Sequence, residues 1–185
     1  ASSILWMDAA ETYFLLAEAK LRLNLGDKTV KEYYEEGVKT SFSSKGASGA
    51  ESYLDNDVNV PSTSFIDPTN GRNTDVSRMV STLTVKWDES ASPDKKLERI
   101  MVQKWIAFFP DGQEAWSEMR RTGYPGIVTI NTNASGGEVA NGEIISRLKF
   151  PTKEYSDNGE NTQAAGSLLK GTDSAGTRLW WDVKR

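Results

Sequence analysis

Hydrophobic residues at the start of the chain recur with the spacing of a helix. From about Ile4 to Leu25 the apolar side chains leave only a narrow polar stripe, which predicts a helix that is buried on most of its circumference. Thr29 and Glu32 then form a capping box, the pattern that opens a second helix reaching about Phe42. Because only a few residues join the two helices, they must lie antiparallel, so residues 1–43 predict a helical hairpin.

The pattern changes over residues 44–92, where Ser, Gly, Asn, Asp and Pro mark a loop-rich insertion. Within it we expect a short helical turn at Ala50–Leu54 and a longer one near Val76–Lys86. A connection of this length between helices is unusual and often functional.

A second pair of helices is predicted over residues 93–125, as a tight corner. Ser92 followed by a proline has the features of an N-cap, and the helix after it places Trp105 on its apolar face. A Pro-Asp-Gly sequence ends that helix, and Gln113–Arg121 forms a shorter one. We expect both Trp105 and Trp116 to be buried between the helices of this corner.

Residues 126–185 carry a weaker pattern. The β-prone runs Ile127–Thr132 and Ile144–Phe150 predict a small β-hairpin, and Pro151–Gly176 predicts an extended loop with one short helical turn. The chain then ends in an aromatic tail at residues 179–182. The whole pattern predicts a mainly α-helical fold of tetratricopeptide-like hairpins, an α-α superhelix, with long loops and a small β-hairpin.

The composition narrows the classes of function. The 185 residues are 37% hydrophobic and 26% charged, which is typical of a globular protein, and the net charge of −4 gives no reason to expect a nucleic-acid partner. Histidine and cysteine are both absent, which excludes catalysis by Ser-His-Asp or Cys-His groups and the usual zinc sites. No apolar run approaches the ~20 residues that span a bilayer, so we expect no transmembrane segment. The start lacks the features of a signal peptide and looks like a helix entered from upstream.

Three blocks of sequence are distinctive in their order along the chain. They are a first helix with the step Ala17-Glu18-Ala19, a helical block with Glu98-Arg99, Phe108-Phe109, Gly112 and Met119–Gly123, and a final block at Arg147–Tyr155 followed by Asn158 and Asn161–Gln163. Together they resemble the C-terminal part of SusD/RagB (SusD-like) proteins, outer-membrane nutrient-binding lipoproteins. The resemblance leaves out the loop at residues 43–75. Glu114-Ala115-Trp116 departs from the family's pattern, which indicates a divergent branch.

The resemblance implies a bacterial protein on the cell-surface side of the outer membrane, held by a lipid anchor in an N-terminal region that this chain does not contain. Such proteins bind oligosaccharides or polysaccharides, without enzymatic activity, and pass them to a SusC-like TonB-dependent transporter. One alternative is a tetratricopeptide-like scaffold that docks on the transporter without binding sugar. Another is a glycosidase fragment that would use two of the carboxylates Glu98, Asp111, Glu114 and Glu118.

A sugar site needs exposed aromatic rings flanked by polar side chains, because sugar rings have apolar C–H faces and polar hydroxyl edges. Two stretches have this composition, Trp87-Asp88 and Trp180-Trp181-Asp182. The alternative for both is that the tryptophans close a seam of the core.

Arg120 and Arg121 end a predicted helix, where cations are favourable without any ligand. One of the two could pair with Glu11 or Glu18 across the helical hairpins. We therefore interpret these four residues as structural.

A calcium site is the one cofactor hypothesis that the sequence raises. Asp55, Asp57 and Asn59 have the spacing of the first three ligands of a calcium loop. Val60 and Ile66 stand at the sixth and twelfth positions, which excludes a complete EF-hand. We expect no cofactor, with an irregular calcium site as the alternative.

Overall fold

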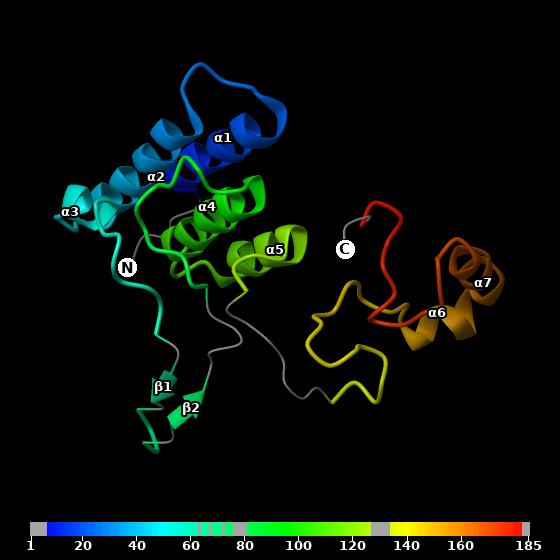
Figure 1. Ribbon diagram of the computed structural model, residues 1–185. Helices are drawn as coiled ribbons and strands as arrows, with labels where there is room; N and C mark the ends of the chain where they lie inside the picture. The colour runs from blue at the N-terminus through cyan, green and yellow to red at the C-terminus, as the bar shows by residue number, and fades with distance from the viewer. Residues whose placement is uncertain are drawn as a thin grey trace, which may run out of the picture. The chain divides into compact units, whose positions relative to one another are not determined.

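The computed structural model describes residues 7–62, 64–66, 68–71, 73–75, 81–126 and 134–182. Within these residues the chain forms seven helices and one pair of short strands, so the mainly helical class predicted from the sequence is confirmed (Figure 1). The chain divides into two compact units, unit 1 at Ala1–Ile127 and unit 2 at Val128–Arg185.

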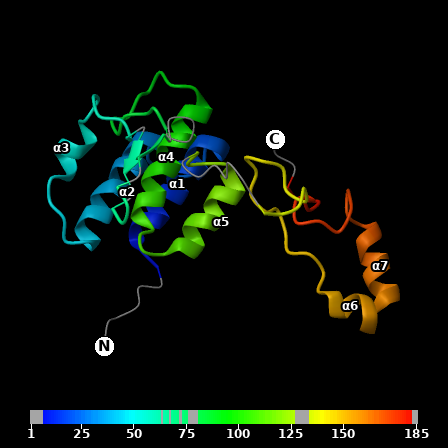
Figure 2. The same ribbon diagram turned by 90° about the horizontal axis from the view of Figure 1, so that it is seen from below.

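The first two helices of unit 1 pack together as the predicted hairpin. Helix α1 (Ala9–Leu23) and helix α2 (Val30–Ser44) lie side by side in both views (Figures 1 and 2). Both parts of the predicted capping box of α2 are formed. The helices approach closely at Gly37, where an added Cβ would lie 2.8 Å from the ring of Phe14. Only glycine therefore allows this contact without displacing the ring.

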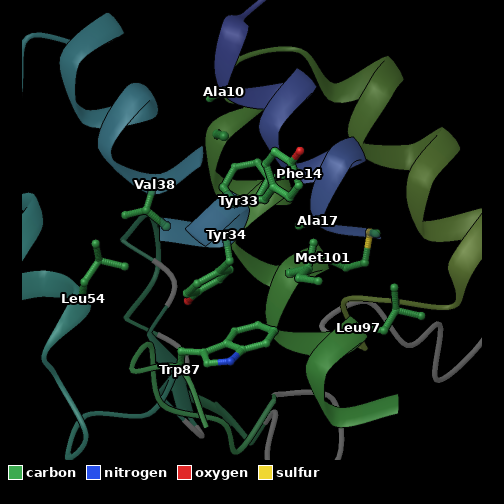
Figure 3. Packing of buried hydrophobic residues seen from close by; sticks show 12 residues of the cluster. Ala10, Phe14, Ala17, Tyr33, Tyr34, Val38, Leu54, Trp87, Leu97 and Met101 are labelled. Atoms are coloured by element: carbon green, nitrogen blue, oxygen red, sulfur yellow. The ribbon is translucent and has the colours of Figure 1, made fainter. Parts of the chain in front are cut away.

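Helix α4 (Pro93–Ala107) completes the core of unit 1 by packing against α1 and α2, and helix α5 (Gly112–Thr122) follows it. Figure 3 shows the cluster of buried side chains between them. The cluster contains Ala10, Phe14, Ala17, Tyr33, Tyr34, Val38, Leu54, Trp87, Leu97, Ile100, Met101 and Ala107. Apolar area removed from water in this cluster stabilises the arrangement of the three helices.

The loop-rich segment contributes helix α3 (Ala50–Leu54), as predicted, and the strands β1 (Ser64–Ile66) and β2 (Asn73–Asp75), which pair antiparallel. The helix predicted near Val76–Lys86 is wrong for residues 81–86, and residues 76–80 lie outside the described residues. The backbone carbonyls of residues 84 and 85 instead accept hydrogen bonds from Arg99 Nε and Tyr34 Oη, at 3.1 Å and 2.6 Å. Tertiary contacts have replaced the helical ladder here.

Unit 2 differs from the prediction in two places. Helices α6 (Thr152–Asp157) and α7 (Gly159–Ser167) occupy a region for which the sequence predicted one helical turn. Ile144–Phe150 forms no strand: the amides of residues 146 and 147 donate to the carbonyl of Ala175, and the amide of Phe150 donates to the carboxylate of Asp173. The other predicted strand, Ile127–Thr132, lies outside the described residues. The small hairpin of the structure is therefore β1–β2.

Candidate functional site

Trp87 is not the exposed platform that the sequence suggested. Its side chain is 9% exposed and belongs to the core of unit 1, with its ring centroid 5.2 Å from that of Tyr34 (Figure 3). Lys96 Nζ lies 5.9 Å from the centroid of the indole. Trp87 is buried because the loop that carries it folds onto α2 and α4, where the indole is the apolar group that fills the space.

Asp88 is exposed, but its carboxylate is engaged locally. It accepts hydrogen bonds from the backbone N and the Oγ of Ser90, at 2.9 Å and 2.6 Å. These bonds hold the pKa of the Asp88 carboxyl below its usual value. The pair Trp87-Asp88 therefore closes a turn over the core and presents no aromatic face to a ligand.

Trp180 and Trp181 are placed differently. They are 77% and 53% exposed, and they form the corner of a turn in which Asp182 N donates to the carbonyl of Leu179 at 3.0 Å. Side chains at the corner of such a turn point away from the chain that enters and leaves it. The structure thus brings two large aromatic rings to the surface of unit 2, followed at once by a partly buried carboxylate, Asp182.

Arg121 joins α5 to α1 through Glu18. Its Nη1 and Nη2 donate to the two carboxylate oxygens of Glu18 at 2.9 Å and 2.5 Å, and Nη2 also donates to Glu118 at 2.7 Å. Burial alone would raise the pKa of Glu18, but the hydrogen bond and charge of Arg121, together with Arg22, lower it below its usual value. Of the two carboxylates that the sequence leaves open as partners, Glu11 and Glu18, Arg121 pairs with Glu18.

Arg120 does something else. Its guanidinium lies over the ring of Trp116, 4.6 Å from the centroid, a geometry that favours a cation–π contact. Trp116 is half-buried rather than part of the core cluster, which corrects the expectation of full burial. Glu11, the other carboxylate considered for pairing, has a raised pKa, chiefly because it is partly buried. The positive charge of Lys104 lowers this pKa, and the negative charges of Glu114, Glu118 and Asp111 raise it.

Helix α4 buries Lys104 and leaves its neighbour Trp105 exposed. Lys104 is 1% exposed and Trp105 is 38% exposed, so the prediction of a buried Trp105 is wrong. Leu97, Ile100 and Met101 fix the rotation of α4 against α1 and α2, and Lys104 continues that stripe. Its ammonium can be buried because Glu118 Oε2 lies 3.3 Å away.

The carboxylates considered for a glycosidase are occupied by structural contacts. Glu98 is paired with Lys95 at 2.8 Å, and Glu118 with Arg121 and Lys104. Asp111 caps α5 by accepting from the amides of Gln113 and Glu114, both at 3.1 Å. Glu114 is exposed to solvent, and one carboxylate does not make the pair that the reaction needs.

Two of the three residues of the calcium hypothesis, Asp57 and Asn59, have other contacts in the structure, and the site stays a prediction. Asp57 Oδ2 lies 3.2 Å from Lys86 Nζ, and Asn56 Oδ1 accepts from the amides of Val58 and Asn59. Among the residues that the structure describes, no group of three or more acidic side chains could hold a metal ion.

Sequence reasoning missed a centre of hydrogen bonds in unit 2. Asp173 binds the Nη1 of Arg147, the backbone N of Phe150 at 3.2 Å and the Oη of Tyr155 at 2.7 Å. Desolvation would raise the pKa of Asp173, but these donors lower it below its usual value. The signal was present in the block Arg147–Tyr155, but its partner lies about twenty residues further on and no local pattern connects them.

The molecule is therefore a helical protein that displays an aromatic pair on a second, loop-rich unit. Residues 1–182 match the family model described as SusD-like, Susd and RagB outer membrane lipoprotein, and the chain belongs to this family. No helix in the described part of the chain is long and apolar enough to cross a membrane. No curated protein matches the chain.

Solved structures agree with this assignment. A chitin-binding SusD homolog from Flavobacterium johnsoniae is 41% identical, with a TM-score of 0.85, over 98% of this chain and 37% of its own. A SusD homolog from Bacteroides uniformis is also 41% identical, with a TM-score of 0.85, over 99% and 38%. A SusD-like protein from Bacteroides thetaiotaomicron is 38% identical, with a TM-score of 0.83, over 96% and 37%. The chain spans less than two-fifths of the length of these three relatives.

Proposed function

We propose that this chain is part of a non-enzymatic glycan-binding protein of the outer membrane, and that Trp180 and Trp181 stack against sugar rings. The exposed aromatic pair at the turn of unit 2 is the observation that carries the proposal. Membership of the SusD-like family and 41% identity to a chitin-binding relative support it. The ligand class is an oligosaccharide or polysaccharide, with chitin fragments as the first candidates.

The chemistry of the pair suits such a ligand. An indole offers a flat apolar surface to the C–H face of a pyranose, and Asp182 supplies an acceptor for hydroxyl or amide donors beside it. Contacts with one or two rings give weak binding, with a dissociation constant of roughly micromolar to millimolar. Tighter retention of a long glycan would come from additional contacts in a larger assembly.

That assembly, in our proposal, is a SusC-like TonB-dependent transporter at the cell surface, with the glycan protein held by a lipid anchor. The family's description as outer-membrane lipoproteins supports this placement. Co-purification of the full-length protein with a SusC-like transporter would test the partnership independently of sugar binding.

Calorimetric titration of the chain with chitin hexasaccharide tests the sugar hypothesis. Replacing both tryptophans (Trp180→Ala with Trp181→Ala) should weaken binding by about 5- to 150-fold, because two stacking contacts of about 0.5–1.5 kcal/mol each are removed. The matched control is Trp105→Ala, which removes a partly exposed indole from unit 1. Wild-type affinity in the double variant would overturn the assignment of the site. Cellulose hexasaccharide, which lacks the N-acetyl groups, reports whether those groups are recognised.

One observation favours the alternative of a protein-docking scaffold. Trp105, Ile106 and Phe109 are 38%, 46% and 77% exposed and fall on one side of α4 and its C-terminal turn. Such an apolar stripe suits a protein partner. No heat with any glycan, together with transporter co-purification that Phe109→Ser abolishes, would support the scaffold instead.

A further inference from the structure

We propose that a junction of three loops in unit 2 holds the Trp180–Trp181 turn in position, so that Gly176 and Thr177 are positioning residues for ligand binding. The junction consists of Glu138, residues 146–150 with Tyr155, and residues 172–177. This inference rests on the proposed function, since it concerns the same aromatic pair. In this proposal the junction restricts the positions that the two tryptophan side chains can take.

The first half of the junction is centred on Asp173. Besides the three donors described above, the neighbouring carbonyl of Ala175 accepts from the amides of Ser146 and Arg147, at 2.8 Å and 3.3 Å. Arg147 is 8% exposed, so its ion pair with Asp173 is shielded from water. These bonds fix residues 173–175 against residues 146–150.

The second half is centred on Glu138. Its carbonyl accepts from Ser174 Oγ at 2.9 Å, and its carboxylate accepts from Lys149 Nζ at 2.6 Å and from the amide of Ala175 at 3.4 Å. The chain passes so close here that a Cβ added to Gly176 would fall well inside van der Waals contact of the Glu138 carbonyl oxygen. Glycine is required at this position by space and not by backbone angle.

The junction leads directly into the aromatic turn. Thr177 Oγ1 donates to the carbonyl of Thr172 at 2.6 Å, and the turn from Leu179 to Asp182 begins two residues later. Among the described residues of unit 2 only Val139, Arg147 and Thr162 are buried, so an apolar core does not fix the turn. We infer that the hydrogen bonds of the junction fix the turn instead. A pre-positioned aromatic pair binds more tightly because its side chains lose less freedom on binding.

The test compares Gly176→Ala with Gly166→Ala in the 185-residue chain. Gly166 lies in α7 with no atom within 4 Å of an added Cβ, so it is a matched glycine in the same unit. We expect Gly176→Ala to raise the dissociation constant for chitin hexasaccharide about 5- to 30-fold, since two aromatic side chains must then be ordered on binding. Gly166→Ala should leave the constant unchanged.

Fluorine NMR of protein labelled with 5-fluorotryptophan separates positioning from unfolding. The signals of Trp180 and Trp181, assigned by Trp180→Phe and Trp181→Phe, should move toward the shifts of an unstructured chain in Gly176→Ala. The signals of Trp87, Trp105 and Trp116 should stay where they are. Unchanged affinity and unchanged signals in Gly176→Ala would overturn the inference.

A milder variant keeps the inference testable if Gly176→Ala does not fold. Thr177→Val removes only the hydroxyl that bonds to Thr172, and should shift the same two signals and weaken binding to a smaller extent. Failure of the proposed function can be distinguished from failure of the positioning role, because the double tryptophan variant would then bind the hexasaccharide as the wild-type protein does. If that variant loses binding while Thr177→Val and Gly176→Ala bind normally, the site stands and the junction has no positioning role.

Discussion

Different interactions stabilise the interior of each of the two units of this chain. Unit 1 buries Phe14, Tyr34 and Ile100 completely in a contiguous core, and it also buries the side chain of Lys104. In unit 2 the described residues bury one apolar side chain, Val139, and the loops are joined by hydrogen bonds around Asp173 and Glu138. Apolar burial stabilises in proportion to area, whereas each hydrogen bond contributes about 0.5–1.5 kcal/mol net. Unit 1 therefore provides stability, and unit 2 provides a surface whose shape is set by a few directional contacts.

The largest effect should come from opening a cavity in unit 1. Phe14→Ala removes a ring that is fully buried against Tyr34 and Gly37, and should lower the free energy of unfolding by about 3–5 kcal/mol. Urea unfolding followed by circular dichroism measures the change. Leu168→Ala, at a side chain 83% exposed in unit 2, is the control and should stay within about 0.5 kcal/mol. Equal effects at the two sites would contradict the contrast between the units.

A second prediction concerns the two adjacent arginines of α5. Arg121→Ala leaves Glu18, whose side chain is 7% exposed, with its ion pair to Arg22 but without the bidentate pair, and should cost about 2 kcal/mol of stability. Arg120→Ala removes the cation–π contact with Trp116 and should cost less, about 0.5–1 kcal/mol. The same urea titration compares them. A larger loss at Arg120 would mean that the bidentate pair with Glu18 is not what joins α5 to α1.

The pH dependence of that pair has a defined sign. Because the pKa of Glu18 is lowered in the folded state, its ionised form contributes stability above the pKa of the unfolded chain, and this contribution is lost as pH falls through the folded-state pKa. The difference in unfolding free energy between wild type and Arg121→Ala should therefore be constant near pH 7 and shrink below about pH 4, where the carboxyl of an ordinary glutamate is protonated. A difference that grows on acidification would exclude Glu18 as the partner.

Local signals in the sequence predict the helices of unit 1 but not the rotation of each helix against its neighbours. The helices of unit 1 were predictable because capping residues such as Thr29 and Ser92 act locally, and their signals stand next to the elements that they start. The rotation of α4 was not, because Lys104 is an acceptable core residue only in the presence of Glu118, which lies on another helix. Local patterns place a lysine outside and a tryptophan inside, and a distant charge reverses that order.

Unit 2 was harder to predict for a related reason. Thr162 supports α7 by donating its hydroxyl to the carbonyls of Glu154 and Asn158, in a segment whose glycines disfavour a helix. Exposure of Trp180 and Trp181 could be proposed from their flanking polar residues, whereas the same reasoning misplaced Trp87. The difference is a tertiary one, since only the loop at Trp87 folds back onto a core.

Amide hydrogen exchange can show whether the units respond separately. Asp173→Ala removes the acceptor of the Phe150 amide and the partner of Arg147, so exchange at residues 146–150 should accelerate by about ten- to a hundredfold. Amides of α1 and α2 should exchange as in the wild-type protein. Faster exchange throughout unit 1 would mean that the two units open together, and the comparison would fail.

The smallest effect is expected at the lysine of the core. Lys104→Met keeps an unbranched side chain of similar length in a site that is 1% exposed, and Arg121 remains as a partner for Glu118. Removing one member of a buried ion pair is costly only when the other is left unpaired, and Glu118 keeps Arg121, so we expect a change of less than about 1 kcal/mol in either direction. Lys104→Trp is the contrasting variant, because overpacking the same site should cost about 1–3 kcal/mol. If tryptophan were tolerated at position 104, the site would not be as tight as its neighbours Leu97, Ile100 and Met101 suggest. If methionine were not tolerated, the charge of Lys104 itself would be holding α4 against α5.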